Sequence, residues 1–175
     1  MLNFRDESTF RAFIKEHQDK VFNIVLKMVQ QINDAEEITQ DVFVDVYRKP
    51  DAFRGGSSVT TWLYRIAMNK SIDHIRRKRK WSLFGSFNSE INQPPDFIHP
   101  GVQAENREKA TFLFKAMQKL PGKQHQAWVL SEMENLSYKE ISEVMNISLS
   151  SVESLLFRAR QNLRKFLSGM YPGEK

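Results

Sequence analysis

The clearest structural signal in this chain lies in residues 136–165, LSYKEISEVMNISLSSVESLLFRARQNLRK. Ser137 and Glu140 have the spacing of a capping box, which predicts that a helix begins with YKEISEVMN. Ile147 and Ser148 turn the chain, and a last helix is expected at about residues 150–167. Two short helices joined by a tight turn are the helix-turn-helix pattern.

The segments before this motif also have helical spacing. A helix is expected at residues 108–120, because Pro121 and Gly122 follow, and another at residues 124–133. In the last helix the predicted buried positions are Val152, Leu156, Ala159 and Leu163.

The first 80 residues predict four more helices. Apolar residues recur at helical spacing around Phe10 and again from Val21 to Val29. Asp34 with Glu37 at N3 is expected to cap a third helix, and a fourth is expected at about residues 60–79. No alternating strand pattern of useful length interrupts them. The predicted fold class is therefore all-α.

Residues 81–105 differ in composition from the segments on either side. This segment holds three prolines and no helical apolar period, which favours a flexible linker. The sequence therefore predicts two small helical domains, at residues 1–80 and 106–170. Aromatic rings in the linker either pack back on the first domain or lie in a channel of a partner; they are Trp81, Phe84, Phe87 and Phe97.

Composition narrows the class of protein. The 175 residues carry a formal net charge of +5 and no cysteine, which excludes disulfides and thiolate metal sites and fits a reducing compartment. The N-terminal residues have charges where a secretory signal would be apolar. No apolar run approaches the roughly 20 residues needed to span a bilayer, so we expect a cytoplasmic protein without membrane insertion.

An acidic row follows one face of the third predicted helix. Glu37, Asp41 and Asp45 are spaced four apart, and like charges at this spacing repel by a few tenths of a kcal/mol each. The row is either a solvated face or a docking face for a basic partner, which would relieve the repulsion.

The fourth predicted helix carries the opposite charge. Residues 62–80 hold seven basic side chains and one acidic one, and end in RRKRK (76–80). Such a run either solubilises the helix end or contacts backbone phosphates. Nearby Phe53, Trp62 and Tyr64 either belong to the core or stack on unpaired bases.

Signals for catalysis are weak. The four histidines are scattered without metal spacing, and neither a phosphate-binding glycine loop nor a nucleophile elbow is present. We therefore expect a protein that is not an enzyme, with no catalytic residue, metal, cofactor or small-molecule substrate.

Four blocks of this sequence together carry a family resemblance. DAEEITQDVFVDVY (34–47) and FRGGSSVTTWLYRIAMNKSIDHIRRKRK (53–80) resemble region 2 of extracytoplasmic-function (ECF) sigma factors of the sigma-70 family. LPGKQHQAWVL (120–130) and residues 136–165 resemble their region 4. The resemblance implies a factor that binds core RNA polymerase, recognises −35 and −10 promoter elements and melts promoter DNA. It further implies transcription of a stress or envelope/transport regulon, and an anti-sigma factor as partner.

The resemblance also implies roles for individual residues. Contact with core polymerase would fall to Asp34, Glu37, Gln40, Asp41 and Phe43. Binding and melting of the −10 element would fall to Phe53, Arg54, Gly55, Ser57, Trp62, Arg65, Asn69, Arg76 and Arg77. Binding of the −35 element would fall to Ser148, Ser150, Ser151, Glu153, Ser154 and Arg158, with Arg160 and Arg164 nearer phosphates.

Glu153 departs from the basic residue found in many members of this family. It either accepts a hydrogen bond from cytosine N4 or closes a capping box with Ser150, and the capping role is slightly favoured.

Two other classes of function compete. A stand-alone helix-turn-helix DNA-binding regulator would leave the acidic row and the first 80 residues unexplained. An adaptor that binds polymerase or an anti-sigma factor without DNA would leave RRKRK unexplained.

Overall fold

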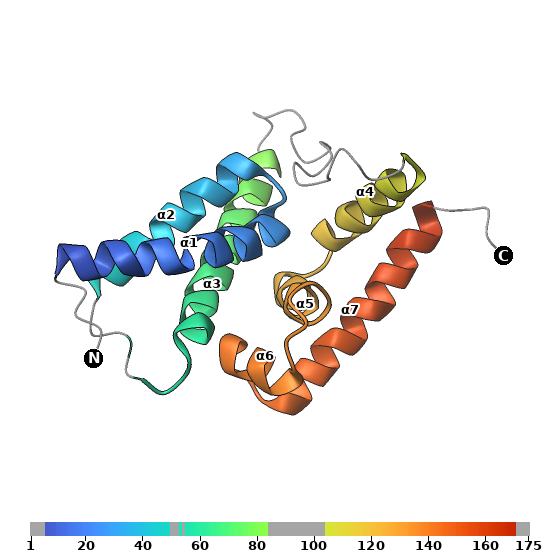
Figure 1. Ribbon diagram of the computed structural model, residues 1–175. Coiled ribbons are helices and arrows are strands. Elements are labelled where there is room, and N and C mark those ends of the chain that lie inside the picture. Colours follow the sequence, from blue (N-terminus) through green and yellow to red (C-terminus); the bar gives the residue numbers. More distant parts are fainter. Residues whose placement is uncertain (1–5, 50–52, 54, 84–103, 171–175) are drawn as a thin grey trace.

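The computed structural model describes residues 6–49, 53, 55–83 and 104–170, and in these ranges the chain is helical with no strand. Figure 1 shows the helices in chain order. They are α1 (Glu7–Val29), α2 (Ile32–Arg48), α3 (Val59–Leu83), α4 (Ala104–Gln118), α5 (Gly122–Trp128), the π-helical turn η3 (Val129–Met133), α6 (Tyr138–Met145) and α7 (Leu149–Met170). The expectation of an all-α fold is confirmed.

The first helix is longer than the sequence pattern suggested. Two separate segments were expected before Asp34, whereas α1 runs without a break over 23 residues. Asp6 caps its start by accepting a hydrogen bond from the Thr9 amide at 2.8 Å. Gln30 ends it in the left-handed conformation, with φ at +64°. The described part of the N-terminal half thus has three helices instead of four.

The three N-terminal helices pack on one another (Figure 1). Val21, Ile24 and Met28 of α1 are almost completely buried, as are Val42 of α2 and Met68 of α3. These side chains recur every three to four residues, so each helix turns one apolar stripe inward.

The C-terminal half is built around α7, which packs on α4, α5 and α6. The four positions predicted to be buried on α7 are buried: Val152, Leu156, Ala159 and Leu163. The single helix expected at residues 124–133 is instead α5 followed by the wider turn of η3. The expected capping box of α6 is present, with the Ser137 amide donating to Glu140 at 2.8 Å.

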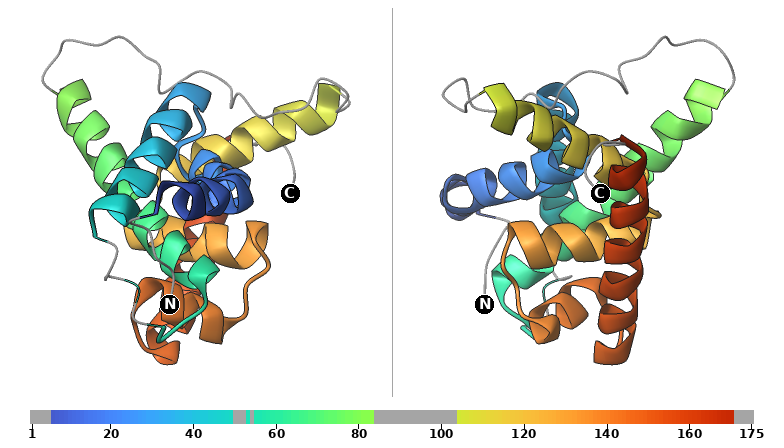
Figure 2. Two further views of the ribbon diagram at one scale, coloured as in Figure 1. Left: turned by 60° about the vertical axis from the view of Figure 1, so that its left-hand side comes forward. Right: turned by 90° about the vertical axis from the view of Figure 1, so that its right-hand side faces the viewer.

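The two halves share one buried cluster of side chains. Helix α5 lies between α3 and α7, and α6 packs against α3 (Figures 1 and 2). A Cβ on Gly122 would meet Ile72 of α3 at 3.3 Å, so glycine permits the close approach of α5 to α3. The packing of the two halves places several site residues against the opposite half.

Both ends of the segment expected as a linker are helical. Helix α3 continues to Leu83 and α4 begins at Ala104, so residues 81–105 are not all irregular. Trp81 lies in the last turn of α3 with 71% of its surface exposed. The other three linker aromatics, at 84, 87 and 97, lie outside the described residues. In the described part of the chain, no helix is both long and apolar enough to cross a membrane.

Candidate nucleic-acid and polymerase interfaces

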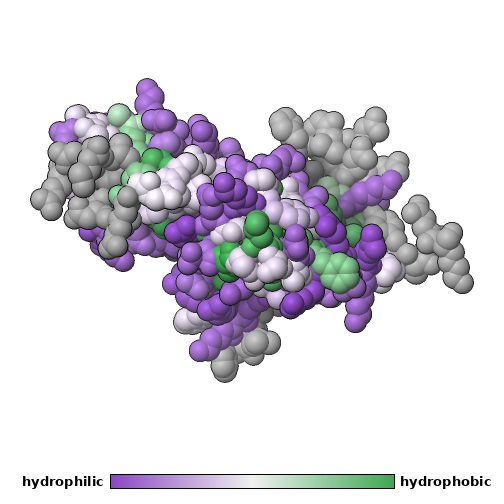
Figure 3. All heavy atoms as spheres, turned by 90° about the horizontal axis from the view of Figure 1, so that it is seen from below, coloured by the Kyte–Doolittle hydropathy of each residue, from purple (hydrophilic) through white to green (hydrophobic). Residues whose placement is uncertain are grey.

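The first candidate surface is the open face of α7. Ser150, Glu153, Ser154 and Arg158 are all exposed there and follow one another at helical spacing. Figure 3 shows the molecule from below, where scattered apolar side chains lie within a mainly hydrophilic surface.

The start of α7 differs from the expectation. Because the helix begins at Leu149, Ser148 is its cap, and its hydroxyl accepts a hydrogen bond from the Ser151 amide at 3.2 Å. Ser150 therefore lies inside the first turn, and the expected capping box between Ser150 and Glu153 is wrong. Glu153 is exposed, so its carboxylate is open to an outside donor.

Two residues of this face escaped the sequence reasoning. Leu149 is 50% exposed and Phe157 is 62% exposed. Phe157 follows Ser150 by seven residues and Ser154 by three, so helical spacing alone puts them on one face. This spacing is the sequence signal for Phe157, and it competes with the tendency of apolar residues on a helix to lie in the core.

The two arginines expected nearer phosphates differ from each other. Arg160 donates to a carboxylate oxygen of Glu132 in η3 at 3.0 Å, and this hydrogen bond raises the pKa of Arg160. Arg164 is exposed one turn further along. Arg160 is thus already held by an acidic side chain, whereas Arg164 points to solvent.

The second candidate surface is the acidic row of α2. Glu37, Gln40 and Asp41 are exposed. Asp41 and Asp45 both face Lys70 of α3, whose ammonium lies 3.8 Å from the first and 2.9 Å from the second. The repulsion within the row is therefore partly relieved inside the chain.

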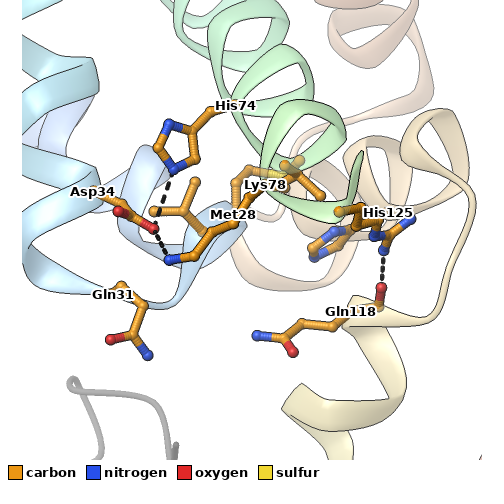
Figure 4. Close-up of a pocket in the computed structure, with 10 residues that line it drawn as sticks. Met28, Gln31, Asp34, His74, Lys78, Gln118 and His125 are labelled. Carbon is orange, nitrogen blue, oxygen red and sulfur yellow. Dashed lines mark hydrogen bonds and ion pairs between the residues drawn. The ribbon is translucent and has the colours of Figure 1, made fainter. Parts of the chain in front are cut away.

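Asp34 lies at one end of this row and is not open like its neighbours. Helix α2 begins at Ile32 after Gln31, so the expected cap at Asp34 is wrong, and the residue lies in the first turn. Its carboxylate contacts His74 at 3.2 Å and Lys78 at 2.9 Å, beside a small cavity (Figure 4). The close contact with His74, and then the hydrogen bond from Lys78, lower the pKa of Asp34 against the effect of burial.

Phe43 was expected at the polymerase contact but lies in the core. Only 6% of its surface is exposed, and its ring packs edge-on against Phe13 of α1. Its role in any docking surface is therefore to hold α2 in place.

The side chains of the basic run at the end of α3 point in two directions, some to solvent and some to other helices. Consecutive residues on a helix are turned by about 100° from each other, so five in a row cannot share one face. Arg76, Arg77 and Lys80 are exposed. Lys78 turns inward to Asp34, and the Arg79 guanidinium donates to the backbone carbonyl of Gln118 in α4.

The loop before α3 holds its aromatic residue against the core. The Phe53 ring lies 5.2 Å from the Trp62 ring, and Trp62 is only 8% exposed. The alternative of a core position is thus the one that the structure favours for Trp62. Gly55 has a φ of +72°, in the left-handed region that favours glycine, while Ser57 is half-buried and Arg54 lies outside the described residues.

The remaining residues expected at the −10 element lie along α3. Asn69 is exposed, as are Arg76 and Arg77. Arg65 instead donates to two backbone carbonyls at the end of α6, those of Glu143 at 2.5 Å and Val144 at 3.3 Å. The expected −10 residues therefore do not form one continuous open surface here.

Across the residues placed by the structure, no three His, Asp or Glu side chains gather closely enough to hold a metal ion. The exposed face of α7 offers hydroxyl, carboxylate and guanidinium groups for hydrogen bonding, and the acidic row of α2 offers negative charge to a basic partner surface.

A helix-turn-helix, here α6 and α7 behind a half that carries an acidic row and a basic run, is a motif of DNA-binding proteins. Residues 13–81 match the family described as Sigma-70 region 2, and residues 113–163 match Sigma-70, region 4. The ECF RNA polymerase sigma factor SigW of Bacillus subtilis is 30% identical over 169 residues, which cover 93% of this chain and 90% of that protein. The chain belongs to the ECF sigma factors of the sigma-70 family.

Two further comparisons agree. The RNA polymerase sigma-H factor of Pseudomonas aeruginosa is 29% identical over 169 residues, covering 93% of this chain and 88% of that protein. Among solved structures, the sigma factor RpoE of Bartonella quintana, in complex with the anti-sigma factor NepR, has a TM-score of 0.65 at 20% identity. It covers 91% of this chain and 96% of that chain, and at this identity it supports the fold alone.

Proposed function

We propose that this protein confers promoter specificity on bacterial RNA polymerase. It binds the core enzyme, recognises the −35 and −10 elements, opens the −10 region and so starts transcription of a stress or envelope/transport regulon. The observation that carries this proposal is that both sigma-70 regions occur in one chain, region 2 before region 4.

The two halves of the chain have different binding roles. Residues 1–80 bind core polymerase and the −10 element, residues 81–105 link the halves, and residues 106–170 bind the −35 element. This assignment is supported by the acidic row on α2 and by the helix-turn-helix formed by α6 and α7.

Helix α7 is the element that enters the major groove. The second helix of a helix-turn-helix presents its N-terminal part to base edges, and Ser150, Glu153 and Ser154 are exposed there. An exposed carboxylate at Glu153 can accept a hydrogen bond from cytosine N4, and Arg158 can donate to guanine or phosphate. Arg164 binds a phosphate of the DNA backbone, and this contact makes the affinity for DNA depend on the salt concentration.

Helix α2 supplies the contact with core polymerase. Lys70 offsets part of the negative charge of the acidic row, but Glu37 and Asp41 remain exposed. A basic surface on polymerase would further reduce the repulsion between these carboxylates. An anti-sigma factor that covers this surface would keep the protein from polymerase. The sigma factor RpoE of Bartonella quintana, which shares this fold, was solved in complex with an anti-sigma factor, and we propose a partner of the same class for this chain.

The protein acts by binding and does no covalent chemistry of its own. Polymerase supplies the catalysis, and the faces described above hold DNA and the core enzyme. Since the bacterial chromosome and its polymerase lie in the cytoplasm, we infer that the protein works there.

Run-off transcription with purified core polymerase and a promoter library tests the proposal. A sigma factor alone should give transcripts that start at a defined distance from common −35 and −10 elements. A helix-turn-helix regulator would give transcripts only when another sigma factor is added, and an adaptor would not retain promoter DNA. Either of these results would contradict the proposal.

A further inference from the structure

Trp81 is an exposed aromatic residue in the last turn of α3. Within the described part of the chain it is the most exposed of the large apolar side chains, with 71% of its surface open to solvent. Its ring therefore does not pack back on the N-terminal half. A single exposed apolar side chain is common on protein surfaces and does not by itself mark a site, so the surroundings of the ring carry the argument.

The exposed side chains next to Trp81 are basic. Arg77 precedes it by four residues, which is about one helical turn, so the two side chains are neighbours on the surface of α3. Lys80 is the preceding residue, and both cations are exposed. Asp73, the acidic residue of this stretch, lies 3.5 Å from Arg76. The ring is thus accompanied by two cations that point to solvent.

The end of α3 projects from the body of the molecule. Both views in Figure 2 show its last turns extending past the neighbouring helices. The helix continues to Leu83, so Trp81 is placed on a regular element. A ring on a rigid helix loses less conformational freedom on binding than a ring on a loop. The end of α3 is therefore suited to contact a large partner.

Trp81 lies at the end of the surface proposed for the −10 strand. Asn69, Arg76 and Lys80 are all exposed, and seven and four residues separate them, so they lie on one side of α3. At 1.5 Å per residue, Trp81 lies about 18 Å beyond Asn69 along the helix axis. Polar and basic side chains therefore follow α3 to its end, where the aromatic ring is exposed.

An exposed ring beside cations fits single-stranded nucleic acid. The backbone phosphates pair with the cations, and a base of any type can stack on the ring because every base has a flat π face. An apolar channel of polymerase would accommodate the ring, but it would leave the charges of Arg77 and Lys80 without anionic partners. The combination of charge and ring therefore favours DNA as the partner.

We propose that Trp81 stacks on an unpaired base of the opened −10 strand, while Arg77 and Lys80 bind the neighbouring phosphates. This inference rests on the proposed function, because it requires promoter DNA that is opened along α3. The stack replaces contacts that the base loses when the duplex opens, so it helps to hold the strand open.

Binding of the assembled holoenzyme to a fork template tests the proposal. The template has a duplex −35 element and a single-stranded −10 strand, so the measured affinity does not include the cost of melting. Trp81→Ala should weaken binding by about tenfold, as expected for the loss of one stack between a base and an aromatic ring. Trp81→Phe should retain most of the affinity, and Trp81→Leu should lose as much as Trp81→Ala because it keeps apolar area without a ring. Equal affinity of Trp81→Ala and the parent would overturn the proposal.

Templates that lack one base identify the stacked position. An abasic site removes a base and keeps its phosphates. At one position of the −10 strand, the abasic site should weaken binding of the parent, and Trp81→Ala should cause no further loss there. If Trp81→Ala weakens binding by the same factor on every abasic template, the ring does not stack on a base and the proposal is wrong.

The salt dependence of binding separates the ring from the cations. Arg77→Ala should lower the slope of log affinity against log salt concentration by about 0.7, because one phosphate contact to a single strand is lost. Trp81→Ala should leave this slope unchanged, since the ring carries no charge. A slope that falls equally in both variants would contradict stacking.

A photocrosslinker tests the alternative that the ring lies in a polymerase channel. With p-benzoylphenylalanine in place of Trp81, irradiation of the holoenzyme on its promoter should cross-link the protein to the −10 strand. Cross-links to polymerase subunits alone would overturn the proposal. Tyr47→Ala is the matched control, because it removes a 55% exposed ring from α2, and it should bind the fork template as the parent does.

Two further measurements complete the test. The melting temperature of Trp81→Ala should equal that of the parent, since the ring is exposed, so weaker binding reports a lost contact with DNA. If the parent holoenzyme fails to bind the fork template, the proposed function is contradicted together with this inference. If the parent binds and Trp81→Ala binds equally well, the proposed function stands and the role of Trp81 is overturned.

Discussion

The ammonium of Lys70 lies 2.9 Å from a carboxylate oxygen of Asp45, so α3 supplies a counter-ion to the acidic row on α2. The same ammonium lies 3.8 Å from Asp41. Both contacts are at the surface, where an ion pair is worth about 0–1 kcal/mol. The row can therefore be changed without loss of the fold.

The first prediction concerns this row. Glu37→Lys combined with Asp41→Lys should abolish binding to core polymerase, because both exposed negative charges become positive. Stability should change by less than about 1 kcal/mol, since Lys70 keeps Asp45 as its partner. Gel filtration with core polymerase and circular dichroism check the two statements. Glu16→Lys with Asp19→Lys, which makes the same change of charge at exposed positions of α1, should leave binding intact; retained binding in the row variant would contradict the docking role.

The second prediction concerns Glu153. Because Ser148 caps α7, Glu153→Ala should leave the melting temperature unchanged and relax the preference at one −35 position by about 1–3 kcal/mol. Ser148→Ala is the comparison, with an expected loss of about 1 kcal/mol in stability. Arg158→Ala should weaken −35 binding. Selection of DNA sites by each variant, with thermal unfolding, measures both effects. An unchanged site preference in Glu153→Ala would rule out base reading.

The third prediction concerns the stability that Trp62 provides. Its ring is buried against Phe53, so Trp62→Ala should lower the free energy of unfolding by about 3–5 kcal/mol. Trp62→Phe should cost clearly less, because it leaves a smaller cavity. Urea unfolding followed by circular dichroism measures both values. A loss below 1 kcal/mol for Trp62→Ala would mean that the ring is not part of the core in solution.

The fourth prediction concerns promoter melting. Opening DNA costs a mean of about 1.4 kcal/mol per base-pair step, which contacts to the displaced strand must offset. Asn69→Ala with Arg76→Ala should permit holoenzyme assembly and closed-complex binding but reduce permanganate reactivity of −10 thymines. A premelted bubble template should largely rescue this variant. Arg11→Ala, an exposed arginine paired with Glu7 in α1, is the control; equal reactivity in the double variant and the control would assign melting elsewhere.

The fifth prediction concerns acid sensitivity. Burial, and then the nearby Arg79 charge, lower the pKa of His125 from 6.5 to about 4. Burial also lowers the pKa of His17. The unfolded chain therefore binds more protons than the folded chain between these values. The stability that neutral His125 contributes should be complete above pH 6.5 and be lost towards pH 4, by up to about 3 kcal/mol.

Urea unfolding at several pH values between 4 and 8 measures this dependence. His125→Gln should show a shallower fall in stability over the same range, because the group that takes up the proton is gone. If the free energy of unfolding falls equally with pH in the parent and the variant, protonation of His125 is not the cause of the loss of stability in acid.

Local features of the chain were predictable because their partners are close in sequence. The capping box of Ser137 and Glu140 spans three residues, and the buried stripe of α7 repeats every three to four. The acidic row on α2 likewise follows from spacing alone. The predicted start of a helix was wrong where local signals compete. Asp34 is a residue type that favours the cap position, yet α2 begins two residues earlier at Ile32.

The sequence alone determined the helical class, the helix-turn-helix and the signs of charge on α2 and α3, since these depend on neighbours within a few residues. Only the tertiary structure decided which of those side chains remain open. Trp62 is buried, Lys78 turns to Asp34 and Arg65 binds the end of α6. The partners of Lys78 and Arg65 lie 44 and 79 residues away, and the packing of one helix half on the other, unlike helical periodicity, leaves no repeating pattern in the chain.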